Sequence, residues 1–476
     1  VEDDLELEAV HAQIGVINFR QASKSVYNSL LGLINEQSPA NRKADAVSRF
    51  KYYMSHDGKS DLIQSYQDEI QWTLDKYKNK DKFYPFVGEI EKYLGNSAAY
   101  VEGVKELLGQ SGRDDWMADF ERFEAKVTQY DAYVTEHVLP KARQTPNEPI
   151  ALYQLNLKSA GVDAKPETLI KKGKAAFAVI YEDFSALAAK IAKKNHFAKS
   201  DPASVIGFLK AKQVSSIEAV STLYNGASDR LEGIIRDNKL VTLPKKRLKI
   251  RFAGDAESKA APVPHLIPPP LIDNNGIVPE FVVPTSSTGQ LPFDDFGYES
   301  AATILTAHEG RPGHDLQFSK MIENPVSIVR ARYAMNSVNV EGWALYAEDL
   351  VYPYLTDEEK LVALQTRLWR VARYFLDPMV QLGKAGQDKV VEVFNGKLGV
   401  SKTMAGLEYN RYAFRSPGQA TAYYHGLLNI IELKKDLSAE YGQLNLMCFN
   451  DTLLSFGLLP HKQIRLFKEQ FKSCAM

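Results

Sequence analysis

The sequence predicts a mainly α fold, in which a large multi-helix domain carries a small β-sheet beside a central cleft. Apolar residues recur at spacings of three and four over most of the 476 residues, which is the pattern of amphipathic helices. One proline-rich segment, residues 254–296, interrupts this pattern, and short β-like runs accompany it. These observations favour helices built around one short sheet.

Two long helices are predicted in the first half of the chain. Their apolar positions lie three or four residues apart and form one stripe on each helix. The first stripe comprises Trp116, Phe120, Phe123, Val127, Tyr130, Val134 and Val138, and the second comprises Leu169, Gly173, Ala176, Ile180, Phe184, Leu187 and Ile191. We expect both stripes to pack in the core rather than bind a cofactor.

The sheet is expected within residues 247–285. Apolar and basic residues alternate over 248–252, and residues 280–284 are rich in β-branched and aromatic side chains. One edge strand should lie beside the cleft and pair with an extended peptide, with an ordered cover loop as the alternative. His265, which is flanked by prolines, is interpreted as a surface residue.

A further helix is predicted over residues 358–376. It should end at Asp377-Pro378, because proline does not continue a regular helix. Arg367, Arg370 and Arg373 are three residues apart in this helix. Two interpretations are open, a polar cavity lining or a solvated or salt-bridged face, and the second is favoured.

Composition is that of a globular protein without an unusual partner. The formal charge is -1, which gives no electrostatic footprint for nucleic acid, and no apolar run approaches the roughly 20 residues needed to span a bilayer. Cys448 and Cys474 are too few for a disulfide framework, although a single bridge is possible. We expect an N-terminal helical region over 1–140 that forms one continuous unit with a larger region over 141–476.

The segment from His308 to His314, with the sequence HEGRPGH, resembles the zinc-protease signature H-E-x-x-H with two extra residues. On an ideal helix, histidines six apart would point roughly 120° away from each other. Pro312 breaks the helix and Gly313 tolerates a bulge, so we predict a distorted turn over residues 311–313 that brings both rings to one point. In the alternative, Pro312 ends the helix and His314 lies at the surface.

Two carboxylates follow in the segment EGWALYAE, which starts at Glu341 and ends at Glu348. They are seven residues apart and lie on one helical face, and the apolar residues between them indicate a buried helix. Buried carboxylates need a partner, and two His plus one Glu is an established zinc set. We therefore predict one zinc ion bound by His308, His314 and Glu341, with Glu348 orienting a ligand histidine.

A third cluster, over residues 411–426, supplies hydrogen-bond donors. Tyr423, Tyr424 and His425 are candidates for stabilising a developing oxyanion, and Tyr423 is preferred. Arg411 or Arg415 is a candidate for binding a substrate carboxylate, although either could pair with a structural acid such as Glu408 instead.

Together these motifs resemble the family known as domain of unknown function 885, whose members carry H-E-x-x-P-G-H, E-G-W-A and P-G-Q-A-x-x-Y. The segment PIALY, which ends at Tyr153, is also similar. The resemblance covers roughly residues 140 to 465. It implies a mostly helical, gluzincin-like metallopeptidase, distantly similar to the carboxypeptidase Taq, thimet oligopeptidase and angiotensin-converting enzyme groups. These groups support the roles of Glu341 and Tyr423.

The chain departs from that family at one position. Many members have an Asp-x-x-x-His element after the glutamate helix, whereas residues 377–381 place glutamine where the histidine is expected. A role for that histidine does not carry over. Members also tend to be longer at the N-terminus.

The function expected from these residues is zinc-dependent hydrolysis of peptide bonds, of carboxypeptidase or oligopeptidase type. The zinc ion activates water, Glu309 acts as general base, and Tyr423 stabilises the oxyanion. One alternative is a helical binding or scaffold protein with a vestigial or structural metal site. Another is a zinc hydrolase of esters or non-peptide amides.

An exported location, periplasmic or at the cell envelope, is expected from the resemblance and from a chain that begins with Val1 instead of methionine. A cytoplasmic location is the alternative.

Overall fold

The computed structural model describes residues 2–34, 36–55, 61–78, 80–254, 257–258, 261–285 and 291–476. The chain divides into two compact units, Val1–Pro146 and Asn147–Met476. We name them unit 1 and unit 2 and describe each by itself. That the whole chain forms one continuous unit stays a prediction.

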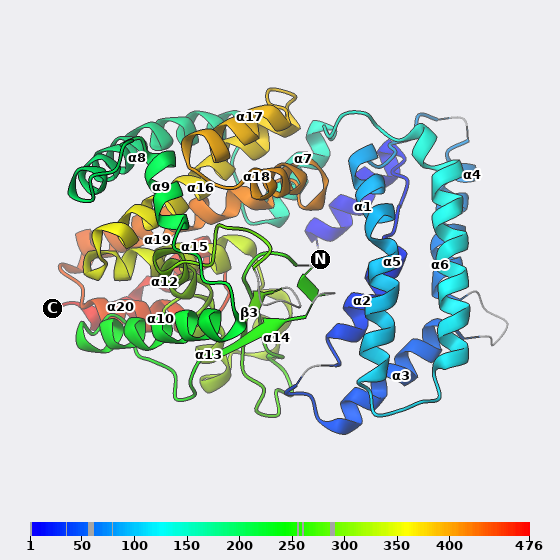
Figure 1. The fold of residues 1–476 in the computed structure, drawn as a ribbon, viewed down its shortest axis with the longest axis horizontal. Helices are drawn as coiled ribbons and strands as arrows, with labels where there is room; N and C mark the ends of the chain where they lie inside the picture. Colours follow the sequence, from blue (N-terminus) through cyan, green and yellow to red (C-terminus); the bar gives the residue numbers. More distant parts are fainter. Residues whose placement is uncertain are drawn as a thin grey trace. The chain divides into compact units, whose positions relative to one another are not determined.

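Unit 1 is helical throughout its described elements. Its helices are α1 (Glu2–Ile14), α2 (Ala22–Leu31), α3 (Ala40–Tyr53), α4 (Leu62–Lys76), α5 (Val87–Gly109), α6 (Met117–His137) and the short η1 (Leu139–Lys141). Within the unit, α2 packs along α5 and α4 packs along α6 (Figure 1). Five residues of the predicted stripe, from Phe120 to Val134, form the buried face of α6, and the two end members, Trp116 and Val138, cap the helix, which confirms it.

Unit 2 is also mainly α, as predicted. Its α-helices are α7 (Ile150–Ser159), α8 (Pro166–Lys194), α9 (Pro202–Lys210), α10 (Ile217–Asp237), α12 (Glu299–Glu309), α13 (His314–Glu323), α14 (Ile328–Tyr333), α15 (Ser337–Val351), α16 (Asp357–Gln381), α17 (Gln387–Val391), α18 (Lys402–Asn410), α19 (Ala422–Tyr441), α20 (Leu446–Ser455) and α21 (His461–Ile464). Shorter or wider turns of helix are η2 (Tyr352–Tyr354), η3 (Glu392–Lys397), η4 (Arg411–Arg415), η5 (Gln419–Thr421) and η6 (Arg465–Cys474).

The predicted small sheet lies in unit 2. Its strands are β1 (Lys249–Ala253), β2 (His265–Ile267) and β3 (Glu280–Pro284), in the spatial order β1-β3-β2. The central strand β3 is fully buried and pairs parallel with β1 and antiparallel with β2. Strand β2 is therefore an edge strand of this sheet.

Helices α8 and α16 pack along each other in unit 2, with α8 at the edge of the unit (Figure 1). The predicted second stripe supplies this contact, since Leu169, Phe184 and Ile191 of α8 are fully buried. Helix α16 begins at a capping box in which Thr356 and Glu359 satisfy each other's backbone N–H groups.

The predicted end of α16 at Asp377-Pro378 is wrong, because the helix continues through Pro378 to Gln381. A proline inside a helix costs about 3 kcal/mol through the lost hydrogen bond and the ring clash. Residues 376–381 are all buried, and the Asn147 amide donates to the carbonyl oxygens of Val380 and Gln381. Tertiary packing and these bonds hold the last turn.

The favoured interpretation of the three arginines of α16, a solvated or salt-bridged face, is correct in that the face is salt-bridged and wrong in that it is not solvated. Arg370 and Arg373 are buried, and Arg367 is half-buried. Ion pairs offset the cost of burying their charge, with Asp349 for Arg367 and with Glu408 for Arg373. The arginine face therefore turns inward and is ion-paired.

Helices α15 and α19 approach each other closely, because glycines stand where they cross. A Cβ on Gly342 would lie 2.6 Å from the Cα of Gly426. This contact lies one residue from Glu341 on α15 and three residues from Tyr423 on α19. The close contact of the two helices fixes the spacing between Glu341 and Tyr423.

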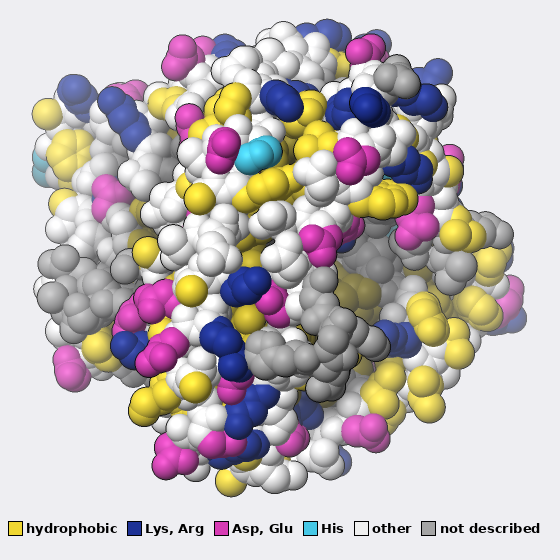
Figure 2. Space-filling view, turned by 90° about the vertical axis from the view of Figure 1, so that its right-hand side faces the viewer, with side chains coloured by type: hydrophobic (Ala, Val, Ile, Leu, Met, Phe, Trp, Pro, Cys, Tyr) yellow, Lys and Arg dark blue, Asp and Glu magenta, His cyan; other side chains and the backbone are white. Residues whose placement is uncertain are grey.

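Within the described part of the chain, no helix is long and apolar enough to cross a membrane. Basic and acidic side chains stand side by side on the face drawn in Figure 2. That no nucleic acid binds stays a prediction.

Candidate metal centre

The turn between α12 and α13 brings the two histidines together. Helix α12 ends at Glu309 and α13 begins at His314, so residues 310–313 form the predicted distorted turn. A Cβ on Gly313 would lie 1.8 Å from the carbonyl oxygen of His308, so only glycine fits where the chain folds back. The result is two helices joined by a tight turn instead of one bulged helix.

Two buried side chains clamp this turn. The Trp343 indole Nε1 donates to the carbonyl oxygens of Pro312, at 3.0 Å, and of Gly313, at 3.2 Å. Arg311 is 2% exposed and its guanidinium binds Asp315, Glu232 and the carbonyl oxygen of Lys246. The turn is therefore held by groups from α10 and α15 as well as from its own flanks.

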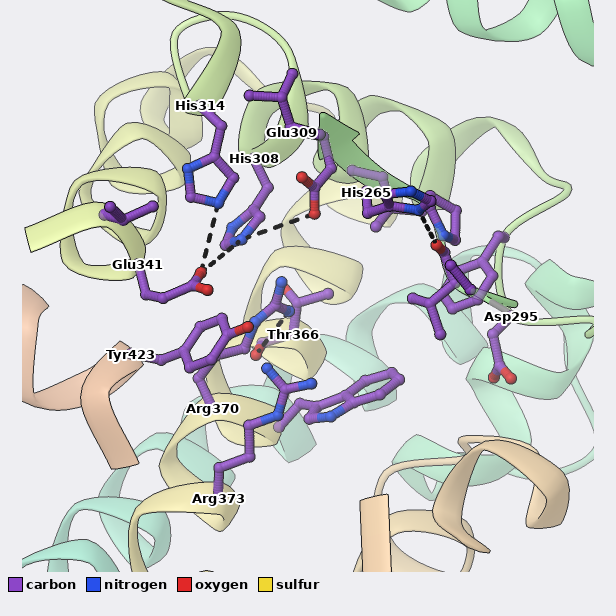
Figure 3. Close-up of a pocket in the computed structure, with 18 of the residues that line it drawn as sticks. His265, Asp295, His308, Glu309, His314, Glu341, Thr366, Arg370, Arg373 and Tyr423 are labelled. Atoms are coloured by element: carbon purple, nitrogen blue, oxygen red, sulfur yellow. Dashed lines mark hydrogen bonds and ion pairs between the residues drawn. The ribbon is translucent and has the colours of Figure 1, made fainter. Parts of the chain in front are cut away.

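The imidazoles of His308 and His314 converge on Glu341 of α15 (Figure 3). The distance from Glu341 Oε2 is 3.4 Å to His314 Nε2 and 3.7 Å to His308 Nε2. One ligand atom from each residue lies within 4.8 Å of the other two. The structure thus brings together the three residues predicted to bind zinc.

The donor set fits a zinc ion. Tetrahedral zinc with bonds of about 2.0–2.1 Å holds its N and O ligands roughly 3.3 Å apart, close to the distances found. Glu341 Oε2 is buried and has no hydrogen-bond partner, so a cation at this point would satisfy it. Burial alone would raise the pKa of Glu341, but the neighbouring His308 and His314 rings lower it well below its usual value.

Glu348 lies behind His308, where a second carboxylate was predicted. Its Oε1 lies 2.7 Å from His308 Nδ1, and its Oε2 accepts a hydrogen bond from the Thr366 hydroxyl at 3.0 Å. Burial acts to raise the pKa of Glu348, but Arg370 and His308 outweigh it and lower the pKa to about 2. An ionised Glu348 fixes the His308 tautomer and leaves Nε2 to face the metal position.

Glu309 and Tyr423 stand on either side of these residues. Glu309 Oε1 lies 4.0 Å from His308 Nε2, and Figure 3 draws its carboxylate facing the same cavity. The Tyr423 ring is nearly parallel to the His308 ring, with centroids 6.3 Å apart. Burial raises the pKa of Tyr423, so its hydroxyl keeps its proton at neutral pH.

Tyr424 and His425 do not reach the site. Successive residues on a helix point about 100° apart, so only one of the three can face the cavity from α19. Tyr424 packs edge-on against Tyr374, and His425 Nδ1 lies 3.2 Å from the Tyr374 hydroxyl. Of the predicted oxyanion donors, only Tyr423 lines the cavity.

The metal position opens on a cavity of about 360 Å³. Its walls come from α12, α15 and α16, from η4 and from the edge strand β2 with the residues before it. His265 was interpreted as a surface residue, which is wrong, because β2 turns it towards the cavity and leaves it half-buried (Figure 3).

Four arginines line the cavity, including both predicted substrate-binding residues. These are Arg370, Arg373, Arg411 and Arg415. Glu408, the structural acid considered for Arg411 and Arg415, accepts hydrogen bonds from Arg373 Nε at 2.8 Å and Arg373 Nη2 at 2.6 Å. Arg370 and Thr366 were not predicted as site residues, and their spacing of four on one buried helical face is the signal that could have found them.

The comparisons with known proteins concern the whole fold. Residues 6–466 match the family model described as "Bacterial protein of unknown function (DUF885)". The chain belongs to this family. No curated protein matches it.

Two solved structures share the fold of this DUF885 chain. A "putative lipoprotein" from Colwellia psychrerythraea matches with a TM-score of 0.73 at 20% identity, over 93% of this chain and 78% of that one. A "putative lipoprotein of unknown function" from Shewanella oneidensis matches with a TM-score of 0.69 at 20% identity, over 94% of this chain and 82% of that one.

Three of the segments that resemble the DUF885 family meet at Asp377, away from the cavity lining. Its carboxylate accepts hydrogen bonds from the Tyr153 hydroxyl, at 2.8 Å, and from the Gly418 amide. Gln381, which replaces the expected histidine, donates to the carbonyl oxygen of Tyr412 and accepts from the Glu148 amide. These residues tie α7, α16 and the chain before α19 together.

Proposed function

We propose that this protein is a zinc-dependent hydrolase that cleaves peptide bonds. The observation that carries the proposal is the convergence of His308, His314 and Glu341 on one point beside Glu309, at the wall of a cavity. Two His and one Glu form an established zinc set that leaves a position for water. The wider likeness to gluzincin peptidases belongs to the same proposal.

When bound, the zinc ion lowers the pKa of water and polarises a carbonyl group. Glu309 accepts the proton of the attacking water and passes it to the leaving amine. Glu348 holds His308 in one tautomer through Nδ1, so that Nε2 stays available as a ligand. The two carboxylates lie on different sides of His308, with Glu309 4.0 Å from Nε2 and Glu348 2.7 Å from Nδ1, as these two roles require.

Tyr423 donates to the scissile carbonyl oxygen as negative charge develops on it. Its hydroxyl accepts a hydrogen bond from Arg411 Nη2 at 3.1 Å, which leaves the phenolic proton free for this role. The positive charge of Arg411 also makes Tyr423 a better donor.

Strand β2 is proposed to bind the peptide backbone. It is an edge of the sheet, it pairs with β3 on one side, and it lines the cavity. An extended peptide could add to its other side and gain main-chain hydrogen bonds. An ordered cover over the cavity is the alternative role of this segment.

A location outside the cytoplasm, at the cell envelope, is proposed as well. Cys448 and Cys474 form a disulfide, and such bridges persist mainly in oxidising compartments. The two similar solved structures are described as putative lipoproteins, which favours the same location.

The test combines metal analysis with digestion of a diverse peptide library, read by mass spectrometry, for the native chain and for Glu309→Gln. We expect about one zinc ion per chain in both proteins, and cleavage by the native chain alone. Loss of the general base should lower kcat by at least roughly 100-fold. Equal activity of the variant would remove Glu309 from the mechanism, and bound zinc without any cleavage would favour a structural metal or another substrate, such as an ester.

A further inference from the structure

The cavity is unusually cationic on the side that faces the metal position. Figure 3 draws Arg370 and Arg373 reaching into it from α16, with the Tyr423 hydroxyl near both. Arg411 and Arg415 of η4 line it as well. The protein's own carboxylates neutralise some of these charges but not all of them.

Arg373 and Arg370 are engaged with carboxylates. Arg373 forms two hydrogen bonds with Glu408, and Glu408 also accepts from the Tyr412 hydroxyl. Arg370 lies 3.5 Å from Glu348 Oε1 and donates to the carbonyl oxygen of Thr366. Both arginines therefore act mainly on the protein's own acids.

Arg411 differs from these two, because its hydrogen-bond partners are neutral. Its Nη2 donates to the Gln419 side-chain oxygen and to the Tyr423 hydroxyl, and its buried Nε has no partner. Glu341, Glu408 and Asp377 act on it only through space, and each is already engaged with other groups of the protein. A half-buried guanidinium whose Nε is fully buried and which has no hydrogen-bonded carboxylate is costly, and an anionic ligand offsets that cost.

We propose that Arg411 binds the C-terminal carboxylate of the substrate, so that the enzyme is a carboxypeptidase that releases the last residue. This rests on the proposed function. In the reaction the last peptide C–N bond breaks, and water supplies the hydroxyl to the carbonyl carbon and a proton to the leaving amine.

The position of Arg411 relative to Tyr423 sets the length of the leaving group. Arg411 Nη2 lies 3.1 Å from the hydroxyl that is proposed to contact the scissile carbonyl. Consecutive Cα atoms are about 3.8 Å apart, so a carboxylate bound beside Tyr423 belongs to the residue next to the cleaved bond. The cavity volume of about 360 Å³ is at the small end for ligand sites and suits a chain end.

A carboxylate can come from the chain end or from an Asp or Glu side chain, and peptide pairs distinguish them. One pair has the same sequence with a free or an amidated C-terminus, and the other has Asp or Asn as its last residue, both amidated. We expect the free acid to be cleaved with a kcat/KM at least roughly tenfold higher than the amide, with release of one residue. Equal rates, or cleavage only at internal bonds, overturn the proposal, and a preference confined to the Asp peptide assigns Arg411 to an acidic side chain instead.

Variants test the residue itself. Arg411→Gln should raise KM for the free acid by roughly 10- to 100-fold and leave KM for the amide unchanged, and Arg411→Lys should restore part of the loss in KM. Because Tyr423 loses its hydrogen bond from Arg411, kcat should fall for both peptides alike. Arg465→Gln, at an exposed ion pair with Asp436, is the matched control and should change neither. An equal rise of KM for the free acid and the amide in Arg411→Gln contradicts the assignment.

Binding separates this proposal from the proposed function. Calorimetric titration of zinc-loaded Glu309→Gln protein should show tighter binding of the free acid than of the amide by at least roughly tenfold, and Arg411→Gln in that background should remove the difference. If no peptide is hydrolysed but this difference is found, the carboxylate site stands and the peptidase proposal fails. If peptides are hydrolysed but the free acid and the amide bind equally well, the peptidase proposal stands and the carboxylate site fails.

Discussion

At the scale of single residues, buried charge is tolerated where each group has a defined partner. Glu348 contacts His308, Thr366 and Arg370, and these contacts keep it ionised although it is 2% exposed. His461 is the contrasting case, since it is 3% exposed and its Nδ1 has no hydrogen-bond partner. The first charge is stabilised by its neighbours, while the second group is held neutral.

The buried His461 should make stability fall in acid. Burial, followed by His425 and Arg465, lowers the pKa of His461 from 6.5 to about 3. Between pH 6.5 and pH 3 the unfolded chain binds a proton at His461 that the folded chain does not bind. The free energy of unfolding is therefore unaffected by His461 above pH 6.5 and decreases as the pH falls towards 3. The expected slope is about 1.4 kcal/mol per pH unit in the free energy of unfolding.

The measurement is urea unfolding between pH 4 and 7 for the native chain and for His461→Gln. The variant lacks this titration, so its stability should depend less steeply on pH over this range. Parallel curves for the two proteins would show that His461 does not titrate as described.

At the scale of elements, the turn between α12 and α13 is the part of the molecule on which the metal centre depends. Gly313 passes against the carbonyl oxygen of His308, and Trp343 holds the turn from α15. The same helix carries Glu341, so one packing contact sets the positions of all three ligands. A substitution in the turn should therefore first lower the affinity for the metal ion.

Gly313→Ala should weaken zinc binding by at least roughly tenfold, because an added Cβ would meet backbone 1.8 Å away and displace His314. The matched control is Gly207→Ala in α9, where a Cβ meets nothing within 4 Å. That variant should keep zinc and gain up to about 1 kcal/mol in stability. Zinc affinity is measured by competition with a chelator, and equal affinity of the two variants contradicts the prediction.

The disulfide joins the start of α20 to the end of η6, with a sequence separation of 26 residues. Closing a loop of this length stabilises the folded state by about 3.5 kcal/mol in the chain-entropy treatment. We expect the double variant Cys448→Ser and Cys474→Ser to lose that amount in chemical denaturation. Insensitivity of the native chain to reductant under the same conditions would argue that the bridge contributes little.

At the scale of the whole molecule, every residue of the candidate centre lies in unit 2. A ligand that binds only the folded state stabilises it by about 2.7 kcal/mol at a concentration 100 times its Kd. Zinc should therefore raise the unfolding temperature of unit 2, and chelation should lower it.

Calorimetry with and without a chelator measures this effect, and His308→Ala is the control that should abolish it. If the chain unfolds in two transitions, only one should move with zinc. If it unfolds in one, as expected for one continuous unit, that single transition should move. A shift of equal size in His308→Ala would place the metal elsewhere.

Much of this architecture was predictable from local pattern. The stripes of α6 and α8, the small sheet, and the turn over residues 311–313 follow from spacing and from proline and glycine chemistry. The three candidate ligands could be predicted because each lies in a short motif whose residue types are those that zinc prefers. The helices, the sheet, the turn and the candidate ligands can each be predicted from the pattern and the residue types of one segment.

What the sequence did not decide was which side chains from separate segments would meet. The helix through Pro378, the inward face of Arg370 and Arg373, the cavity position of His265 and the absence of Tyr424 and His425 from the cavity lining each depend on neighbours distant in the chain. The sequence by itself determined the helices, the sheet and the types of the candidate ligands, because these depend on local periodicity and chemistry. Only the tertiary structure decided their orientation and ion pairing, because burial and charge compensation are properties of packed surfaces rather than of segments.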